Sequence, residues 1–202
     1  MIIKDRKKLE VKCEPCSSIE EGEEIGAKLL NELNKPEVSG IGLAANQIGI
    51  NKRVCVVNVK QPIVLINPKI IEKSKDKFLF LEGCLSFPND SIKTVRYKSV
   101  TVEADNYESK LHFGVWNEHN EEGYNKHDKL DYALETACVQ HEIDHLDGIT
   151  MFDRQFKGTT LKRESKKIGR NDKVTITKGS ESKVLKYKKA QPMLEDGWTL
   201  SI

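Results

Sequence analysis

A five-residue stretch with two histidines is the part of this sequence best suited to chemistry. Residues 141 to 145 read His-Glu-Ile-Asp-His, which is the H-E-x-x-H spacing. On a helix, side chains four residues apart lie one turn apart on the same face, so His141 and His145 can bind one metal ion. Glu142 then lies beside the metal, available as a base. Because two surface histidines on a charged helix would give the same letters, the motif alone does not establish a metal site.

A catalytic site built on this motif needs a third protein ligand and one open position for water. Metzincins place a further histidine six residues after the second one, but that position is Met151 here. A thiolate is therefore the leading type of third ligand. Cys84 is favoured, because it follows an apolar strand and a glycine in the stretch EGCLS. Cys138, three residues before the first histidine, is the rival, although a small buried core residue is an equally good interpretation of it.

A stretch rich in small residues, GIGLAANQ at 40–47, lies between the first predicted helix and the first clear strand. Its glycines fit a tight turn, and it lacks the Lys-Ser/Thr ending of a phosphate-binding loop. Gln47 offers an amide N–H of the kind that polarises a carbonyl oxygen. By itself this stretch is weak evidence for a site.

The five cysteines favour free thiols over a disulfide framework, because their number is odd and their spacing irregular. Reduced thiols are typical of the cytosol. Cys13 and Cys16 have C-x-x-C spacing, but no second pair or nearby histidine completes a zinc site there. Cys55 lies inside an apolar run and is interpreted as core.

Taken together, three stretches resemble the signature motifs of peptide deformylases: GIGLAANQ, EGCLS at 82–86 and QHEIDHLDG at 140–148. They occur in the family's order with similar gaps, and the resemblance runs from about Ser18 to Phe152. It implies an α+β fold with antiparallel sheets around a central helix that carries the H-E-x-x-H motif. It also implies hydrolysis of the N-formyl group from the N-terminal formyl-methionine of newly made polypeptides, with release of formate.

The resemblance gives each matched residue an expected role. The expected metal ligands are Cys84, His141 and His145, and the expected general acid and base is Glu142. The amide of Gln47 and the backbone N–H of Leu85 would stabilise negative charge on the formyl oxygen. The family's usual metal is Fe²⁺, one ion per chain, although Zn²⁺, Ni²⁺ or Co²⁺ suit the same ligands.

The resemblance also predicts where the substrate lies. The family binds its peptide as an added strand, for which the expected backbone partners are Ile41, Gly42, Gly83 and Leu85. A methionine side chain needs an apolar pocket, whose expected walls are Ile41, Leu85, Ala137 and Cys138.

Two other functions compete with this interpretation. A zincin-like endopeptidase would use the same helix to cut internal peptide bonds, but Cys84 and the missing third histidine argue against it. A non-catalytic peptide-binding protein could have a deformylase fold, but every matched motif keeps its chemical groups.

Local patterns predict the elements that must position these residues. A capping box, Ser18-x-x-Glu21, and apolar residues four apart predict a helix over residues 19–34. Asp131 is the expected cap of a second helix that carries the histidines and stops near Gly148. Short β-branched or apolar runs predict strands. These runs are 53–59, 63–66, 78–81 and 98–104.

Length and composition fit a soluble protein with one main domain. The chain has 202 residues, 38% of them hydrophobic and 32% charged. The predicted catalytic deformylase domain is 1–156, with an insertion or long hairpin around 105–129 that carries His112, His119 and His127 on its surface. Residues 157–202 are predicted to add a small β extension to the same domain, with alternating segments at 173–177 and 183–188.

The charge distribution is uneven. Residues 157–190 hold twelve Lys or Arg and three acids, a net charge of +9 in a chain of net +2. Such a segment is either a solvated extension or a contact for ribosomal RNA near the peptide exit. No stretch is apolar enough for a membrane span, and the start lacks a signal peptide, which predicts bacterial cytosol, or host cytosol if a virus encodes the chain.

Overall fold

The computed structural model describes residues 1–114, 126–158, 170–179 and 181–201. They fall into two compact units, which are described separately: residues 1–162 form the first and 163–202 the second.

The first unit holds the motifs. Its helices are α1 (Arg6–Leu9), α2 (Ile19–Leu33) and α3 (Lys126–Leu146), with short 3₁₀ turns η1 (Ala45–Ile48) and η3 (Met151–Arg154). Its strands are β1 (Gly42–Ala44), β2 (Val54–Asn58), β3 (Pro62–Ile66), β4 (Lys69–Lys73), β5 (Lys77–Cys84), β6 (Phe87–Tyr97), β7 (Ser99–Glu103) and β8 (Leu111–Gly114).

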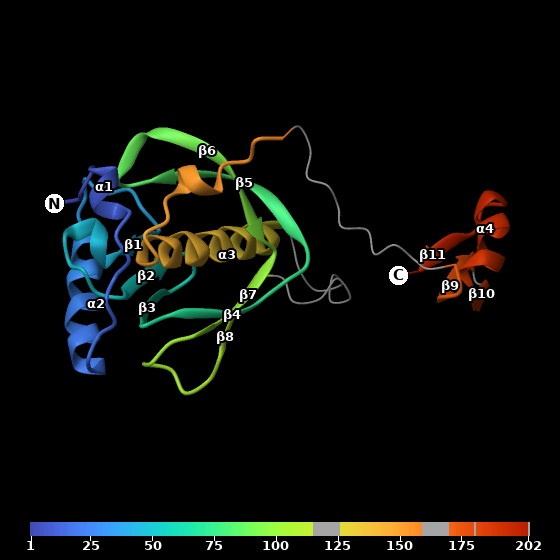
Figure 1. Cartoon of the computed structure of the whole chain (residues 1–202), viewed down its shortest axis with the longest axis horizontal. Coiled ribbons are helices and arrows are strands. Elements are labelled where there is room, and N and C mark those ends of the chain that lie inside the picture. The colour runs from blue at the N-terminus through green and yellow to red at the C-terminus, as the bar shows by residue number, and fades with distance from the viewer. Residues whose placement is uncertain (115–125, 159–169, 180, 202) are drawn as a thin grey trace. The chain divides into compact units, whose positions relative to one another are not determined.

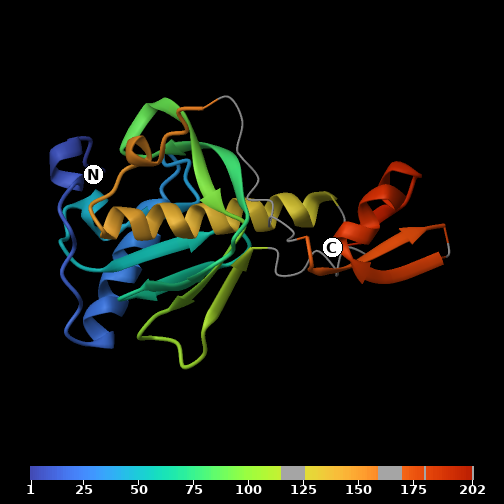
Figure 2. The same cartoon turned by 45° about the vertical axis from the view of Figure 1, so that its right-hand side comes forward.

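These strands form antiparallel sheets with the orders β1-β2-β3, β4-β7-β8 and β5-β6. Helix α3 packs against β1, β2, β6 and β8, and Figures 1 and 2 show it running through the middle of the first unit with sheets on either side. The predicted α+β architecture, with antiparallel sheets around the motif-bearing helix, is therefore confirmed.

Helix α2 forms where its sequence predicts it. The Ser18 side chain caps the helix by accepting from the Glu21 N–H, and the spaced apolar residues Ile25, Leu29 and Leu33 are buried. Two glycines on the same helix, at 22 and 26, approach β3 so closely that any Cβ there would collide with the side chains of that strand. This packing holds α2 against the β1-β2-β3 sheet.

Helix α3 begins earlier than predicted. It starts at Lys126, so Asp131 lies inside the helix and is exposed, and the prediction that Asp131 caps the helix is wrong. Every residue from Glu135 to Leu146 is buried, because sheets surround this half of the helix. The end agrees with the prediction: Gly148 has φ 72°, and a Cβ at that position would lie 2.8 Å from the Glu10 carbonyl oxygen.

Part of the predicted insertion is an ordinary hairpin. Strand β8 pairs with β7, and Phe113, opposite Val100, enters the core. His112 is exposed, as predicted, with Nδ1 3.1 Å from the Thr101 hydroxyl. Residues 115–125, with His119, and the side chain of His127 lie outside the described residues.

The second unit contains β9 (Lys173–Lys178), β10 (Glu181–Lys186), α4 (Tyr187–Glu195) and β11 (Thr199–Ser201). The predicted ribbon is confirmed as the antiparallel pair β9-β10, and β11 adds a third strand on the other side of β9. Val174, Ile176 and Ala190 form a small buried core, against which Trp198 packs. No helix in the described parts of the chain is both long and apolar enough to cross a membrane.

Candidate metal centre

Three predicted ligands from two distant segments meet beside α3. Cys84 ends β5, while His141 and His145 lie one turn apart on α3, and their donor atoms lie within 4.8 Å of one another. Cys84 Sγ is 3.3 Å from His145 Nε2. Ligand bonds of about 2.0–2.3 Å around a tetrahedral ion place neighbouring donors about 3.5 Å apart, so this thiol and imidazole set fits a divalent metal.

Glu82 fixes the orientation of His141. The imidazole Nδ1 lies 2.9 Å from Glu82 Oε2. A carboxylate can only accept, so Nδ1 carries the proton and Nε2 keeps its lone pair for a metal. Sequence reasoning missed this residue, although Glu82 stands two positions before Cys84, and alternation along a strand puts both side chains on one face.

Glu142 is placed to exchange a proton. Its side chain is buried, and its Oε2 has no hydrogen-bond partner among the described residues. Burial raises the pKa of Glu142 to about 7, against a smaller lowering by the charge on His141. The backbone of Gly42 packs directly against this side chain. A Cβ on Gly42 would lie 2.4 Å from Glu142 Oε1 and 2.6 Å from Cys138 Sγ, so a larger residue does not fit there. A carboxyl group that titrates near neutrality can both take and return a proton.

Gln47 is held with its amide N–H₂ towards the Cys84 sulfur. Its Oε1 accepts from the Ala44 N–H at 2.8 Å. Its Nε2 donates to Ser86 Oγ at 3.1 Å and lies 3.5 Å from Cys84 Sγ. The backbone bond fixes which end of the amide faces the site, so the N–H donors point at the ligand cluster.

A cavity of about 430 Å³ opens beside these groups. Its lining contains all the residues predicted to bind substrate or take part in catalysis, and all the predicted ligands except His145. Those lining residues are Ile41, Gly42, Gln47, Gly83, Cys84, Leu85, Ala137, Cys138, His141 and Glu142. The cavity is of the size that small-ligand sites usually have.

Two strand edges border this cavity. β1 is the edge strand of its sheet, and β5 has β6 as its one neighbour in the described part of the chain. Ile41 directly precedes β1, and Gly83 lies in β5 with no atom within 4 Å of a Cβ built on it. Both edges can therefore pair with an extended peptide.

The remaining cysteines lie in the core. Cys138 is buried beside the cavity, and its Sγ is 3.4 Å from the Ile41 carbonyl oxygen. Cys13, Cys16 and Cys55 are buried free thiols. Among the residues that the structure describes, the group of Cys84 and the two histidines is the one set of three close metal-ligating side chains.

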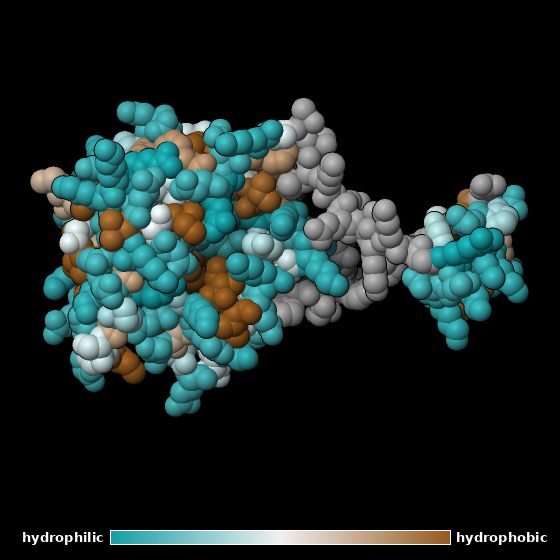
Figure 3. Space-filling view, in the orientation of Figure 1, coloured by the Kyte–Doolittle hydropathy of each residue, from teal (hydrophilic) through white to brown (hydrophobic). Residues whose placement is uncertain are grey.

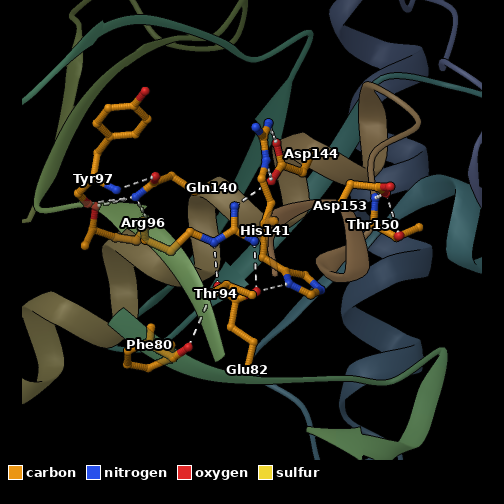
Figure 4. Close-up of polar contacts among 12 residues, drawn as sticks. Phe80, Glu82, Thr94, Arg96, Tyr97, Gln140, His141, Asp144, Thr150 and Asp153 are labelled. Carbon is orange, nitrogen blue, oxygen red and sulfur yellow. Dashed lines mark hydrogen bonds and ion pairs between the residues drawn. The ribbon is translucent and has the colours of Figure 1, made fainter. Parts of the chain in front are cut away.

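Behind the ligands lies a buried network of charges that the sequence did not reveal (Figure 4). Arg96, from β6, binds both oxygens of Glu82, at 2.5 and 2.8 Å, and Asp144 at 2.5 Å. Thr94 donates to Glu82 at 2.7 Å. The signal that could have revealed it is the pattern in β6, where polar residues take the inward positions 94 and 96.

Comparisons with known proteins point to one family. A family model of polypeptide deformylases matches residues 1–162. A peptide deformylase of Rhizobium meliloti is 36% identical over 152 residues, covering 72% of this chain and 76% of its own length.

Solved structures are similar as well. A Synechococcus elongatus peptide deformylase in complex with actinonin has a TM-score of 0.62 at 29% identity, covering 78% of each chain. A probable peptide deformylase from Synechococcus phage S-SSM7 has a TM-score of 0.59 at 34% identity, covering 76% of this chain and 98% of its own.

Proposed function

This chain belongs to the peptide deformylase family, and from that premise we propose how its own residues remove the N-formyl group from newly made polypeptides. The reaction is hydrolysis of a linear amide, and neither the endopeptidase nor the binding-protein alternative finds support in the comparisons. The roles below extend the family's reaction to individual side chains of this chain.

Cys84, His141 and His145 hold one divalent metal ion in this proposal. When bound, such an ion supplies Lewis-acid activation of water at neutral pH. One thiolate and two imidazoles suit Fe²⁺, Zn²⁺, Ni²⁺ and Co²⁺, and the family's usual Fe²⁺ is the native ion we propose. Glu82 keeps His141 in the tautomer that leaves Nε2 for the metal.

Glu142 moves the protons. Its unpartnered oxygen takes a proton as water attacks the formyl carbon, and the same carboxyl then returns the proton to the departing amine. Meanwhile, the Gln47 amide and the Leu85 backbone N–H donate to the formyl oxygen as negative charge builds on it. Removing one donor of this kind typically lowers turnover by about 10²–10³-fold.

The peptide lies between the two free strand edges. Its backbone pairs with residues Ile41, Gly42, Gly83 and Leu85, which line the cavity and lie in or directly next to β1 and β5. Its methionine side chain enters the apolar part of the cavity. The walls of that part are Ile41, Leu85, Ala137 and Cys138.

The observation that carries this proposal is the buried Glu142 carboxyl, which lines the cavity together with Cys84 and His141 and whose Oε2 has no hydrogen-bond partner among the described residues. Its test is deformylation of formyl-Met-Ala-Ser by Glu142→Ala, with metal content assayed. We expect turnover to fall by about 10²–10⁴-fold while metal stays bound, because proton transfer is lost but the ligands remain. Glu135→Gln is the matched control, since Glu135 is a buried acid of the same helix that pairs with Lys60 outside the cavity. Full activity of Glu142→Ala would refute the proposed role.

We further propose that the second unit contacts ribosomal RNA through one end, the basic end, consisting of Arg170, Lys173, Lys186, Lys188 and Lys189. Lys186 lies opposite Lys173, and the Lys188 N–H donates to the Arg170 carbonyl oxygen, so these residues come from adjacent segments. All five are exposed, on a unit whose visible face is mostly hydrophilic (Figure 3), and none forms an ion pair with another described residue. At the far end, by contrast, Lys183 lies near Glu181 and Lys178 binds the Asp196 carbonyl oxygen.

Phosphate contacts give binding that weakens steeply with salt. We expect the full chain to bind purified ribosomes with an affinity that falls as salt rises from 50 to 200 mM. The Lys173→Ala/Lys186→Ala variant should show a shallower salt dependence, lower by about one unit per lysine in a log–log plot. Lys178→Ala is the control. Equal salt slopes for the two variants would argue against the RNA contact. Such a contact would place the enzyme in the cytosol, where polypeptides are made.

A further inference from the structure

A series of hydrogen-bonded side chains connects the protein surface to His141. Arg154 donates to both oxygens of Asp144, at 2.9 Å through Nε and 2.6 Å through Nη2. Asp144 accepts from Arg96 at 2.5 Å, and Arg96 in turn binds both oxygens of Glu82, which accepts from His141. Figure 4 shows Arg96 lying between Asp144 and Glu82, with the His141 ring beyond Glu82.

Arg154, at the outer end of this series, is its most exposed member. The Arg154 side chain is 41% exposed, compared with 10% for Asp144, 3% for Arg96 and 4% for Glu82. Two carboxylates and two guanidiniums balance in charge, so the number of cations equals the number of buried acids only while Arg154 is present. Without Arg154, the single guanidinium of Arg96 would have to serve both carboxylates.

The segment that carries Arg154 is fastened to the strand behind the ligands. Thr150 caps the η3 turn, donating to Asp153 at 2.9 Å through its N–H and at 2.7 Å through its hydroxyl. Phe152 packs edge-on against Phe87, at 4.9 Å between ring centres. The Phe156 N–H donates to the Lys93 carbonyl oxygen in β6 at 2.8 Å. Arg154 is therefore held in place by contacts on both sides of it.

From this arrangement we propose that Arg154 is a positioning residue for the metal centre. Arg154 holds Asp144 in place, so that Arg96 can keep both of its hydrogen bonds to Glu82. Glu82 in turn keeps the His141 ring oriented towards the proposed metal site. Arg154 itself is hydrogen-bonded to Asp144 and to none of the three proposed ligands, and it does not line the cavity. The inference rests on the proposed metal centre and adds a residue beyond the three family motifs.

The test is Co²⁺ affinity, measured by competition with a chromophoric chelator, for wild type, Arg154→Met and Arg154→Lys. Loss of an outer partner of a metal ligand typically weakens metal binding about 10–100-fold, and we expect about tenfold for Arg154→Met. Arg154→Lys should restore part of this loss, because lysine keeps the charge but not the two-pronged geometry. At saturating metal, kcat for formyl-Met-Ala-Ser should fall while KM stays unchanged.

Arg6→Met is the matched control. Arg6 contacts Asp153 and Phe152 of the same segment but is not hydrogen-bonded to the network, so its loss should leave Co²⁺ affinity unchanged. In a double-mutant cycle, Arg154→Met and Asp144→Asn should weaken Co²⁺ binding less than additively, because one acts through the other. Wild-type affinity in Arg154→Met, or equal loss in Arg6→Met, would overturn the inference. Failure of wild type to bind Co²⁺ would instead overturn the metal centre itself.

Discussion

The two units of this chain use charged residues in opposite ways. Behind the proposed metal ligands, Glu82 and Asp144 face Arg96 and Arg154 at 2.5–2.9 Å, and all but Arg154 are buried. At the basic end of the second unit, two lysines face each other across a strand pair and all five cations are exposed. Paired, buried charges hold atoms in fixed positions, whereas exposed like charges raise the local potential and attract a polyanion. The first arrangement suits catalysis and the second suits recognition.

Arg96→Met should break the buried arrangement with the largest effect on stability. It leaves Glu82 without its main cation in a buried site, and breaking a buried pair on one side typically costs about 3–5 kcal/mol. The measurement is the free energy of unfolding from hydrogen exchange of α3 amides. Arg6→Met is the control, because its ion pairs are exposed and surface pairs contribute at most about 1 kcal/mol. Equal effects of the two variants would show that the network contributes no more than a surface pair.

Glu82→Gln tests the same arrangement through pH. Burial by itself raises the pKa of Glu82, but hydrogen bonds from Arg96 and His141 outweigh burial and hold the pKa at about 2. In the unfolded chain, the pKa of a Glu carboxyl is about 4.3. Because the folded pKa is the lower one, the carboxylate's stabilisation is complete above about pH 4.3 and is lost as the pH falls towards 2.

We therefore expect metal-free Glu82→Gln to be less stable than metal-free wild type by on the order of 3 kcal/mol at pH 7. The difference in unfolding free energy should shrink between about pH 4.3 and 2, as measured by denaturant titration at each pH. A difference that stays constant over this range would contradict the assignment of the low pKa to Glu82.

The features that could be predicted from the sequence are those that a local pattern or a family motif specifies. The H-E-x-x-H helix was predictable from its own spacing, which sets both histidines on one face. The choice of Cys84 and Gln47 depended on the resemblance of three motifs taken together, because neither stretch specifies a site by itself. Helix α2 was predictable from its cap and its apolar spacing. The α+β fold class was expected from the family resemblance, and the mixture of helical and strand patterns agrees with it.

The charge network was not predicted, because its members come from separate elements and no single local pattern joins them. β6 presents Thr94 and Arg96 inward, so its buried face reads as polar and the strand was missed. Likewise, α3 is buried on every side in its second half and lacks the one-sided pattern that would have placed its start at Lys126. In both elements, the pattern of polar and apolar residues is set by burial in the tertiary structure.

Lys186→Glu should give the smallest effect and the one most specific to the second unit. It turns the like-charged pair with Lys173 into an opposite pair and places an acid at the start of α4. We expect the second unit to become more stable by on the order of 0.2–1 kcal/mol, while ribosome binding weakens. The readout is hydrogen exchange of the β9 amides. Lys183→Glu is the control of opposite sign, because Lys183 lies 4.5 Å from the Trp198 ring and its loss removes a cation–π contact. If Lys186→Glu destabilised the second unit instead, Lys186 and Lys173 would be stabilising the fold. That result would contradict the proposal that these lysines serve to bind RNA.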